Sequence, residues 1–557
     1  MVTTLVLVLA VWSGQLVNAW EATTDWPSPT VVQAELTSQL DGDIIRPSDA
    51  TYKLEILMKE LQFTREPGAI VLVKSTADIQ KCILFARKYY LRVAVRASGH
   101  SFVGRSTGQG ILMIDVRNLN TITVNKPDPT SVTGASAIVG PGTVMKKLYE
   151  EVEKHNLLAV GGASHTVAVG GLTVGGGHSP ITRTLGLAVD QVLKITLVTA
   201  QGEIAEATES STVVTDQGGQ TRTINNADLF WAVRGGGAAF GVVTEFKIKL
   251  HTPPPAFTSL TMFVPVKHSV VGNAAKDFLQ FYKSFFTTKM SNKWGGYLLI
   301  NNIPTEDRGM TSAGTLTLAL LYYGGWQEAM GSGIKQLLDW QPERRLLFMG
   351  NHTTFWDWRK QSTDQVYVFL YIFNRFMHSN DFSDNLVNFL SDDLNDLPVG
   401  GGCTATHIGG KAAEIPSTSA SVGDNMRSAL WSLSCGVGWE LGKEKETIQK
   451  ASHFRDKLYT LGKGVYYNEP DYHLTNWQEE FWGAKYSRLQ TIKDTWDPDN
   501  FFTCHMCVGT PASSDTCEAL TCPCSLRPCP GGASSTSSNV FVSLFFAKLV
   551  LYFLQMI

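Results

Sequence analysis

The chain has 557 residues, of which 43% are hydrophobic and 17% charged, and its formal net charge is −3. This length predicts more than one folded core, and this composition excludes a largely disordered chain. Because no run of Lys and Arg interrupts this slightly acidic chain, nucleic acid is not an expected partner.

The chain begins with an apolar stretch from Leu5 to Trp12, followed by small and polar residues that end in Ala19. A short apolar run in this position predicts a signal peptide over residues 1–19, although no basic residue precedes it. A buried N-terminal helix is the alternative. Residues 20–64 are expected to form an N-terminal segment of the mature protein.

The next region mixes short apolar runs with helical spacing, which predicts an α+β domain over residues 65–252. The expected elements are strands at residues 68–75, 92–96, 111–115, 136–139, 192–199 and 241–250 and a helix at 76–90. Three consecutive prolines, Pro253 to Pro255, then end the last strand, because proline cannot continue it. A domain boundary is expected there.

Three glycine-rich segments in this region indicate a ligand site. The first, VRASGHSFVG, ends at Gly104 and places His100 in a turn whose glycines let backbone N–H groups converge on a pyrophosphate. By itself, a single histidine in a loop is more often structural. The others, at residues 160–204 and 228–250, allow close approach to a flat ligand. Their spacing is not G-x-G-x-x-G, which disfavours a nicotinamide-type Rossmann site.

Residues 253–461 are expected to form a second α+β domain. Alternating strand patterns occur at residues 259–264, 314–322 and 365–373, separated by helical patterns. The alternation favours an antiparallel sheet with helices packed on it. The sequon at Asn351 fits an exported glycoprotein.

The C-terminal part of the chain is rich in cysteine and ends in an apolar tail. Six of the nine cysteines lie between Cys504 and Cys529, which predicts a disulfide-stapled stalk over residues 511–538 rather than a zinc knuckle. Cys403 and Cys435 are candidate partners in another disulfide, and Cys82 is expected in the core. Residues 539–557 are typical of a GPI-attachment signal, with a membrane span or a packed helix as alternatives. A secreted or cell-surface protein is therefore expected, with possible attachment to the membrane through a lipid anchor.

Together the glycine segments resemble the FAD-linked oxidases of the berberine-bridge-enzyme-like family, whose flavin domain is that of the vanillyl-alcohol-oxidase superfamily. The matching motifs are SGHSFVG, GGLTVGGGHS followed by LGLAVDQV, DLFWAVRGGG followed by FGVVTEF, and YYNE followed by WDPDNFF. The resemblance implies an α+β fold with a two-part PCMH-type FAD-binding domain and a substrate domain whose antiparallel sheet is covered by helices. It also implies that residues 462–510 return to the FAD domain.

The resemblance implies covalent attachment of FAD through its 8α-methyl group to His100. Ser164 stands where bicovalent family members carry a second, cysteinyl link, so attachment through His100 alone is expected. Val167 matches a position that governs oxygen access, and a small valine resembles the oxygen-using members. The residues expected to line the pyrophosphate are Ser98, Gly99, Ser101 and Gly104. The glycines expected at the flavin are Gly170, Gly171, Gly175, Gly176 and Gly177.

In this family a Tyr-x-Asn segment lies beneath the flavin, and Tyr466-Tyr467-Asn468 matches it. Asn468 is expected to contact the flavin ring. Relatives often have a tyrosine base next, but this chain has Glu469, so Tyr466 and Glu469 are both candidate catalytic residues for accepting the substrate hydroxyl proton. A helix cap is the structural alternative for Glu469. No metal is expected at the site.

The implied reaction is oxidation of an alcohol group of a small molecule (a sugar, a phenolic or an alkaloid). Hydride transfer to covalently bound FAD and reoxidation by molecular oxygen would give hydrogen peroxide. Two alternatives remain open: an FAD dehydrogenase with a non-oxygen acceptor, and a non-catalytic cell-surface binding protein on the same scaffold.

Overall fold

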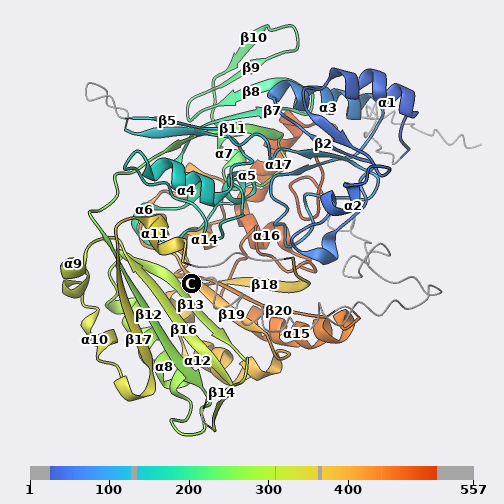
Figure 1. Ribbon diagram of the computed structural model, residues 1–557. Coiled ribbons are helices and arrows are strands. Elements are labelled where there is room, and N and C mark those ends of the chain that lie inside the picture. The colour runs from blue at the N-terminus through green and yellow to red at the C-terminus, as the bar shows by residue number, and fades with distance from the viewer. Residues whose placement is uncertain (1–24, 127–133, 308, 362–366, 441, 511–557) are drawn as a thin grey trace, which may run out of the picture.

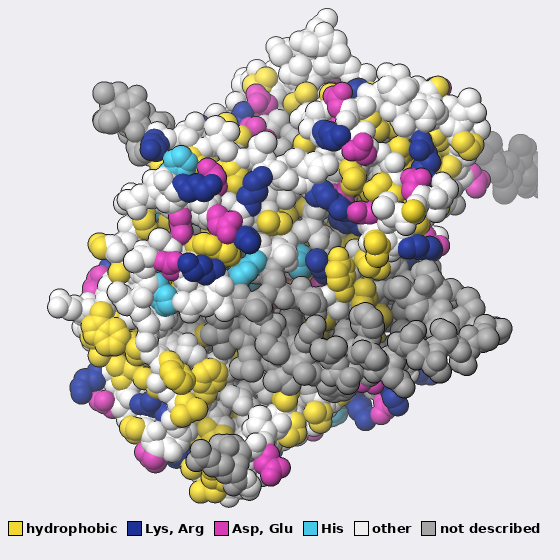
Figure 2. Space-filling view, in the orientation of Figure 1, with side chains coloured by type: hydrophobic (Ala, Val, Ile, Leu, Met, Phe, Trp, Pro, Cys, Tyr) yellow, Lys and Arg dark blue, Asp and Glu magenta, His cyan; other side chains and the backbone are white. Residues whose placement is uncertain are grey.

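The computed structural model describes residues 25–126, 134–307, 309–361, 367–440 and 442–510. The predicted signal peptide, the stalk over 511–538 and the hydrophobic tail lie outside the described residues. No helix in the described part of the chain is both long enough and apolar enough to cross a membrane. On the face shown in Figure 2, basic and acidic side chains are interspersed rather than gathered by sign.

The N-terminal part contains a four-stranded sheet of order β1-β2-β4-β3, in which β2, β4 and β3 are parallel. Its strands are β1 (Asp43–Ile45), β2 (Ala69–Leu72), β3 (Val93–Arg96) and β4 (Leu112–Asp115). Helix α3 (Thr76–Lys88) begins at Ser75, whose side chain accepts a hydrogen bond from the Asp78 N–H. Its apolar side, with the thiol of Cys82, packs into the core beneath this sheet, as predicted for that cysteine.

A second, seven-stranded antiparallel sheet follows, of order β10-β9-β8-β7-β11-β6-β5. Its strands are β5 (Ile122–Asn125), β6 (Ser136–Val139), β7 (Val192–Val198), β8 (Ile204–Ala207), β9 (Thr212–Thr215), β10 (Thr221–Ile224) and β11 (Val242–Lys249). The helices of this part are α4 (Met145–Glu153), α5 (Val169–Val174), α6 (Thr182–Leu185) and α7 (Asp228–Val233). The glycine-rich segments at residues 160–204 and 228–250 carry α5, α6 and β7, and α7 and β11, respectively.

The third sheet is antiparallel throughout, with the order β17-β12-β16-β13-β19-β20-β18. Its strands are β12 (Phe257–Val266), β13 (Trp294–Asn301), β16 (Gly314–Tyr322), β17 (Leu346–His352), β18 (Leu370–Met377), β19 (Gly402–His407) and β20 (Trp431–Gly438). Helices α8 (Ala274–Thr288), α12 (Asp384–Ser391) and α15 (Glu444–Tyr459) pack on one face. The predicted antiparallel, helix-covered sheet is confirmed.

Two local expectations differ from the structure. The strand expected at residues 365–373 is displaced to Leu370–Met377. Strand β13 was not anticipated because all eight of its residues are buried, so it shows no alternation of polar and apolar side chains. The predicted Cys403–Cys435 disulfide is confirmed, and it joins residues directly opposite each other on β19 and β20.

The C-terminal helices lie against the first part of the chain, far from it in sequence. Figure 1 shows α16 (Trp477–Trp482) and α17 (Tyr486–Trp496), in red, among the blue and teal elements. On α17, the buried Lys493 donates to the carbonyls of Ala239 and Phe502 at 2.7 Å and pairs with Asp497 at 2.5 Å. A buried ammonium needs such partners, and here they fix α17 onto the glycine segment before β11.

Candidate functional site

A cavity of about 340 Å³ lies between the glycine-rich segments and the uncovered face of the third sheet. Side chains at alternate positions of β13, β18, β19 and β20 form one wall, because such positions point to the same face of a sheet. The cavity brings together most of the residues singled out from the sequence: Ser98, Gly99, His100, Ser101, Ser164, Val167, Gly170, Gly171, Tyr466, Asn468 and Glu469.

His100 lies in the loop after β3, where Gly99 adopts a φ of +76° that favours glycine. Its Nε2 atom is 2.9 Å from the Thr166 hydroxyl oxygen, in the second glycine-rich segment. In the same loop, the Ser98 hydroxyl accepts a hydrogen bond from the Ala168 N–H at 3.0 Å. The two segments are thus joined by two hydrogen bonds, one of them made by the His100 ring itself, and His100 lines the cavity.

Four of the expected glycines do not line the cavity: Gly104, Gly175, Gly176 and Gly177. Two of them, Gly175 and Gly177, contact residues that do line it. A Cβ atom on Gly175 would come within 2.2 Å of the Asn468 amide oxygen, so only glycine lets Asn468 reach its place. The Gly177 N–H donates to the Tyr466 hydroxyl at 3.1 Å.

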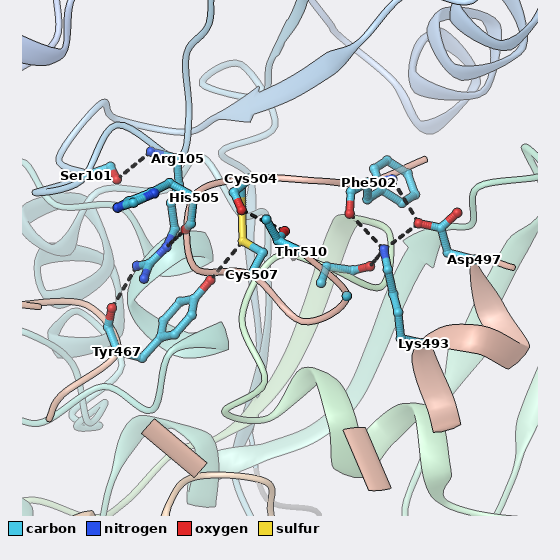
Figure 3. The surroundings of a disulfide bond; sticks show 12 residues. Ser101, Arg105, Tyr467, Lys493, Asp497, Phe502, Cys504, His505, Cys507 and Thr510 are labelled. Carbon is cyan, nitrogen blue, oxygen red and sulfur yellow. Dashed lines mark hydrogen bonds and ion pairs between the residues drawn. A yellow bond between two sulfur atoms is a disulfide. The ribbon is translucent and has the colours of Figure 1, made fainter. Parts of the chain in front are cut away.

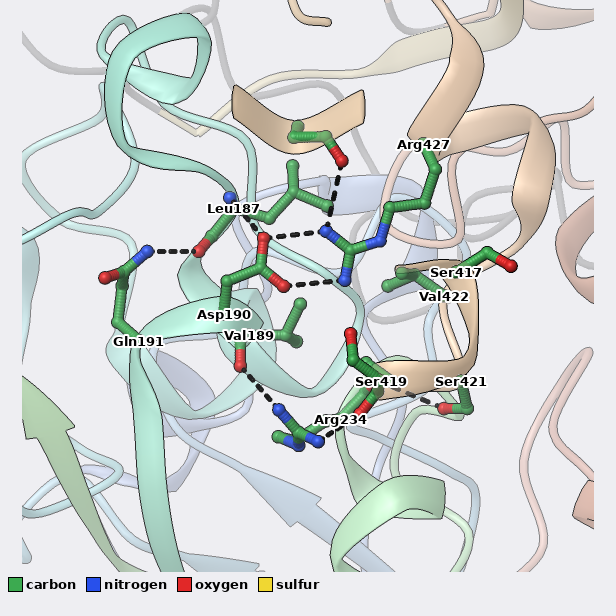
Figure 4. Close-up of polar contacts among 12 residues, drawn as sticks. Leu187, Val189, Asp190, Gln191, Arg234, Ser417, Ser419, Ser421, Val422 and Arg427 are labelled. Carbon is green, nitrogen blue, oxygen red and sulfur yellow. Dashed lines mark hydrogen bonds and ion pairs between the residues drawn. The ribbon is translucent and has the colours of Figure 1, made fainter. Parts of the chain in front are cut away.

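A buried ion pair holds the loop that carries these glycines (Figure 4). Arg427 binds both carboxylate oxygens of Asp190, at 2.7 and 2.6 Å, and both side chains are 4% exposed. The backbone N–H groups next to Asp190, on Ala188 and Val189, donate to the Gly177 and Gly176 carbonyls. Arg427 of the second domain thus holds the glycine loop through a bidentate ion pair with Asp190 of the LGLAVDQV motif.

Glu469 is the centre of a polar cluster in the cavity wall. One carboxylate oxygen lies 3.1 Å from His178 Nε2, and the other accepts a hydrogen bond from the Ser434 hydroxyl on β20. Burial would raise the pKa of Glu469, but the charge of His178 and the hydrogen bonds from His178 and Ser434 outweigh burial and lower the pKa below its usual value. Glu469 is therefore an ionised carboxylate at neutral pH.

Tyr466 lies beside this cluster in a different chemical state. Burial raises the pKa of its hydroxyl, and the charge of Glu469 adds to the effect, so Tyr466 is protonated at neutral pH. Its oxygen accepts hydrogen bonds from the Gly177 N–H and, at 2.9 Å, from the Asn468 amide. Its ring packs against that of His178, with centroids 4.7 Å apart.

Several cavity residues were missed in the sequence. His178 stands directly after the glycine triplet of GGGHS, a position that offered a signal, and Arg105 directly follows Gly104. Tyr297, Thr404 and Ser434 had no local signal. Strand register alone places them together, with Thr404 opposite Ser434 on the neighbouring strand.

The cavity fits a flat cofactor with polar groups. Gly171 has open space where a side chain would stand, so the backbone there is accessible to a bound ring. Four lining side chains carry buried polar atoms without a hydrogen-bond partner: Arg105 (Nη2), Ser106, Tyr297 and Thr404. Unsatisfied buried groups are costly, so they indicate a ligand that pairs with them. Among the described residues, no group of three or more His, Cys, Asp or Glu side chains is arranged to hold a metal.

Comparison with known proteins agrees with this geometry. Residues 67–208 match the FAD binding domain family and residues 465–508 the berberine and berberine-like family. An FAD-linked oxidoreductase of Aspergillus sp. (strain MF297-2) is 30% identical over 512 residues, covering 84% of this chain and 76% of that protein. An uncharacterized FAD-linked oxidoreductase of Arthroderma benhamiae is 28% identical, over 80% and 78% of the two chains.

Solved structures show the same fold. A VAO-type flavoprotein from Myceliophthora thermophila C1 superimposes with a TM-score of 0.70 at 22% identity, covering 87% of this chain and 95% of that one. A xylooligosaccharide oxidase from the same fungus, solved with xylobiose, gives 0.71 at 19% identity, with coverage of 85% and 98%. The chain therefore belongs to the berberine-bridge-like FAD-linked oxidoreductases, and it is an enzyme whose cofactor is FAD.

Proposed function

We propose that this enzyme oxidises an alcohol group of a small molecule, with FAD attached covalently through His100 and molecular oxygen as the final electron acceptor. The observation that carries the proposal is one cavity that joins the His100 loop to the ionised Glu469–His178 pair. A proton acceptor beside a flavin site is what alcohol oxidation requires, because the hydroxyl proton must leave as the hydride does.

The residues that would hold FAD come from three segments. Ser98, Gly99 and Ser101 would lie along the pyrophosphate with the His100 attachment, Gly170 and Gly171 would approach the ring, and Asn468 would contact it. Bound FAD supplies the acceptor for two electrons from the substrate. Since Ser164 occupies the place of the second link, and the lining Cys435 is already bonded to Cys403, a single covalent link is proposed.

The contacts favour Glu469 over Tyr466 as the residue that takes the substrate proton. Glu469 is charged, so it can accept a proton, and its hydrogen bond to His178 holds the carboxylate in the cavity wall. Tyr466 is protonated, and its oxygen is occupied by two donors. We assign it the role of positioning Asn468 and the glycine loop.

The opposite wall would bind the substrate. Tyr297 and Thr404 present hydroxyl groups that lack partners, and both residues are more than nine-tenths buried. Hydroxyl-bearing substrates would satisfy them, which places sugars first among the candidate classes, before phenolics and alkaloids. Val167 lines the same cavity, and a side chain of its small size would leave room for oxygen.

The experiment is anaerobic mixing of the purified flavoprotein with alcohols of the three classes, followed by admission of air. Bleaching of the flavin absorption followed by peroxide release supports the proposal. Bleaching without peroxide identifies a dehydrogenase. A folded protein that binds these alcohols without bleaching, or carries no flavin, would be the surface binding protein. Export through residues 1–19 and lipid attachment at the C-terminus remain predictions.

A further inference from the structure

A short disulfide lies beside the cavity in the C-terminal segment. Cys504 and Cys507 are bonded across the two residues His505 and Met506. The turn is held by hydrogen bonds to the Cys504 carbonyl, from the Cys507 N–H at 3.1 Å and from the Thr510 hydroxyl at 2.9 Å. These two cysteines lie before the predicted stalk over residues 511–538, and they pack against the core of the folded body.

The two sulfur atoms differ in environment. Cys507 is completely buried, and its Sγ lies 3.5 Å from the Tyr467 hydroxyl (Figure 3). Cys504 is partly exposed. Thiol–disulfide exchange needs one sulfur that an incoming thiolate can reach and a second that leaves as a stabilised thiolate. Cys504, the partly exposed member, is the point of attack, and the contact with the Tyr467 hydroxyl is the one that would stabilise Cys507 as the leaving group.

The disulfide also contacts the cavity wall. The Tyr467 ring lines the cavity, and the Arg105 guanidinium lies 3.8 Å from its centroid. Arg105 in turn donates to the Tyr467 carbonyl at 2.7 Å and to the His505 carbonyl, inside the disulfide turn, at 3.0 Å. Movement of the turn would therefore be transmitted to two residues of the flavin site.

The second disulfide gives a contrast within the same chain. Cys403 and Cys435 are 0% and 1% exposed, so neither sulfur is open to attack. They are 32 residues apart in sequence, against 3 for Cys504 and Cys507. Since a disulfide stabilises mainly by closing a loop of the unfolded chain, the shorter link contributes less to stability. Structural support alone therefore explains Cys403–Cys435 better than Cys504–Cys507.

We propose that Cys504–Cys507 is a redox-active disulfide that exchanges with low-molecular-weight thiols. Its reduction or oxidation changes the positions of Arg105 and Tyr467 in the flavin cavity. An external thiolate attacks Cys504 Sγ and forms a mixed disulfide, while Cys507 leaves as a thiolate that accepts a hydrogen bond from Tyr467 and then takes up a proton. A second external thiolate attacks the external sulfur of the mixed disulfide, releasing Cys504. Two thiols are oxidised to one disulfide, and one protein disulfide is reduced to two thiols.

The test uses the flavin-loaded full chain incubated with reduced glutathione, quenched with an alkylating reagent and read by peptide mass at each cysteine. Cys504 and Cys507 should become labelled about tenfold or more faster than Cys403 and Cys435, with a change in the flavin absorption spectrum. Oxidised glutathione should reverse both changes. Equal rates, resistance of both bridges until the protein unfolds, or an unchanged flavin spectrum would overturn the proposal.

Tyr467→Phe gives a second test of the leaving group. Without the hydroxyl, labelling of Cys504 and Cys507 should slow about threefold or more, while Cys403 and Cys435 are unaffected. An unchanged rate would exclude the role of Tyr467. If this variant does not fold, the comparison of the two bridges in the wild-type chain still decides whether Cys504–Cys507 is redox-active.

Discussion

His178 Nε2 lies 3.1 Å from Glu469 Oε1, although the two residues are 291 positions apart in the chain. The pair joins the glycine-rich segment to the C-terminal return, and both side chains line the cavity. It replaces the tyrosine that the resemblance leads one to expect after Tyr-x-Asn. The lowered pKa keeps Glu469 ionised at neutral pH, which is the state in which a carboxylate can accept a proton.

Glu469→Gln should slow substrate-dependent bleaching of the flavin by about 10²- to 10⁴-fold, because the amide cannot accept the hydroxyl proton. The measurement is anaerobic stopped-flow absorption with any substrate found in the screen. Ser434→Ala is the matched control: it removes one hydrogen bond to Glu469 but leaves the charge, so its effect should be several-fold smaller. A Glu469→Gln rate within a factor of two of wild type would exclude Glu469 as the base.

Tyr466→Phe separates the two candidate bases. The protonated hydroxyl mainly accepts hydrogen bonds from Gly177 and Asn468, so its loss should destabilise the protein by about 1–3 kcal/mol. The rate of flavin bleaching should fall much less than in Glu469→Gln. Urea unfolding gives the stability and stopped flow the rate. A greater loss of rate than in Glu469→Gln, with stability unchanged, would assign the base to Tyr466 instead.

Removing one partner of the buried Asp190–Arg427 pair should destabilise the protein strongly, whereas replacing both residues by apolar ones should destabilise it much less. Arg427→Met leaves the Asp190 carboxylate buried without its cation, which should lower the free energy of unfolding by about 3–5 kcal/mol. The double variant Asp190→Leu with Arg427→Met should recover most of that loss. Urea unfolding of the three proteins measures this. If the double variant is as unstable as the single one, the loss of stability does not come from the unpaired Asp190 charge, and the prediction is wrong.

His251 should make the protein less stable in mild acid. Burial, with a smaller effect of the Lys249 charge, lowers the pKa of His251 to about 4, whereas in the unfolded chain it is near 6.5. Between these values the unfolded chain binds more protons, so stability falls as the pH drops from 6.5 to 4. After allowance for its partial exposure, the loss is about 1–2 kcal/mol.

The check is the melting temperature between pH 7 and pH 4. His251→Gln keeps a donor for the Gln191 side-chain oxygen but does not titrate, so it should reduce the pH dependence. Identical curves for wild type and His251→Gln would refute the assignment.

The residues expected to bind FAD could be predicted from local sequence motifs. The residues on the sheet that forms the other wall of the cavity could not, because long-range packing places them there. The glycine segments carry their own signal, since a loop that must approach a ligand closely needs glycine. Tyr297 and Thr404 carry none, because they face the cavity only through the register of β13 and β19. Cys504 packs against a core whose other members are mostly distant in sequence, so the spacing of the cysteines alone could not place it.

Acid precipitation tests the central claim, covalent FAD on His100, most directly. The wild-type protein is precipitated with acid, and the absorption spectra of pellet and supernatant are compared with those of His100→Ala. The account predicts a yellow wild-type pellet and, for the variant, flavin released into the supernatant. Flavin in the wild-type supernatant, or a variant pellet that stays yellow, would contradict it.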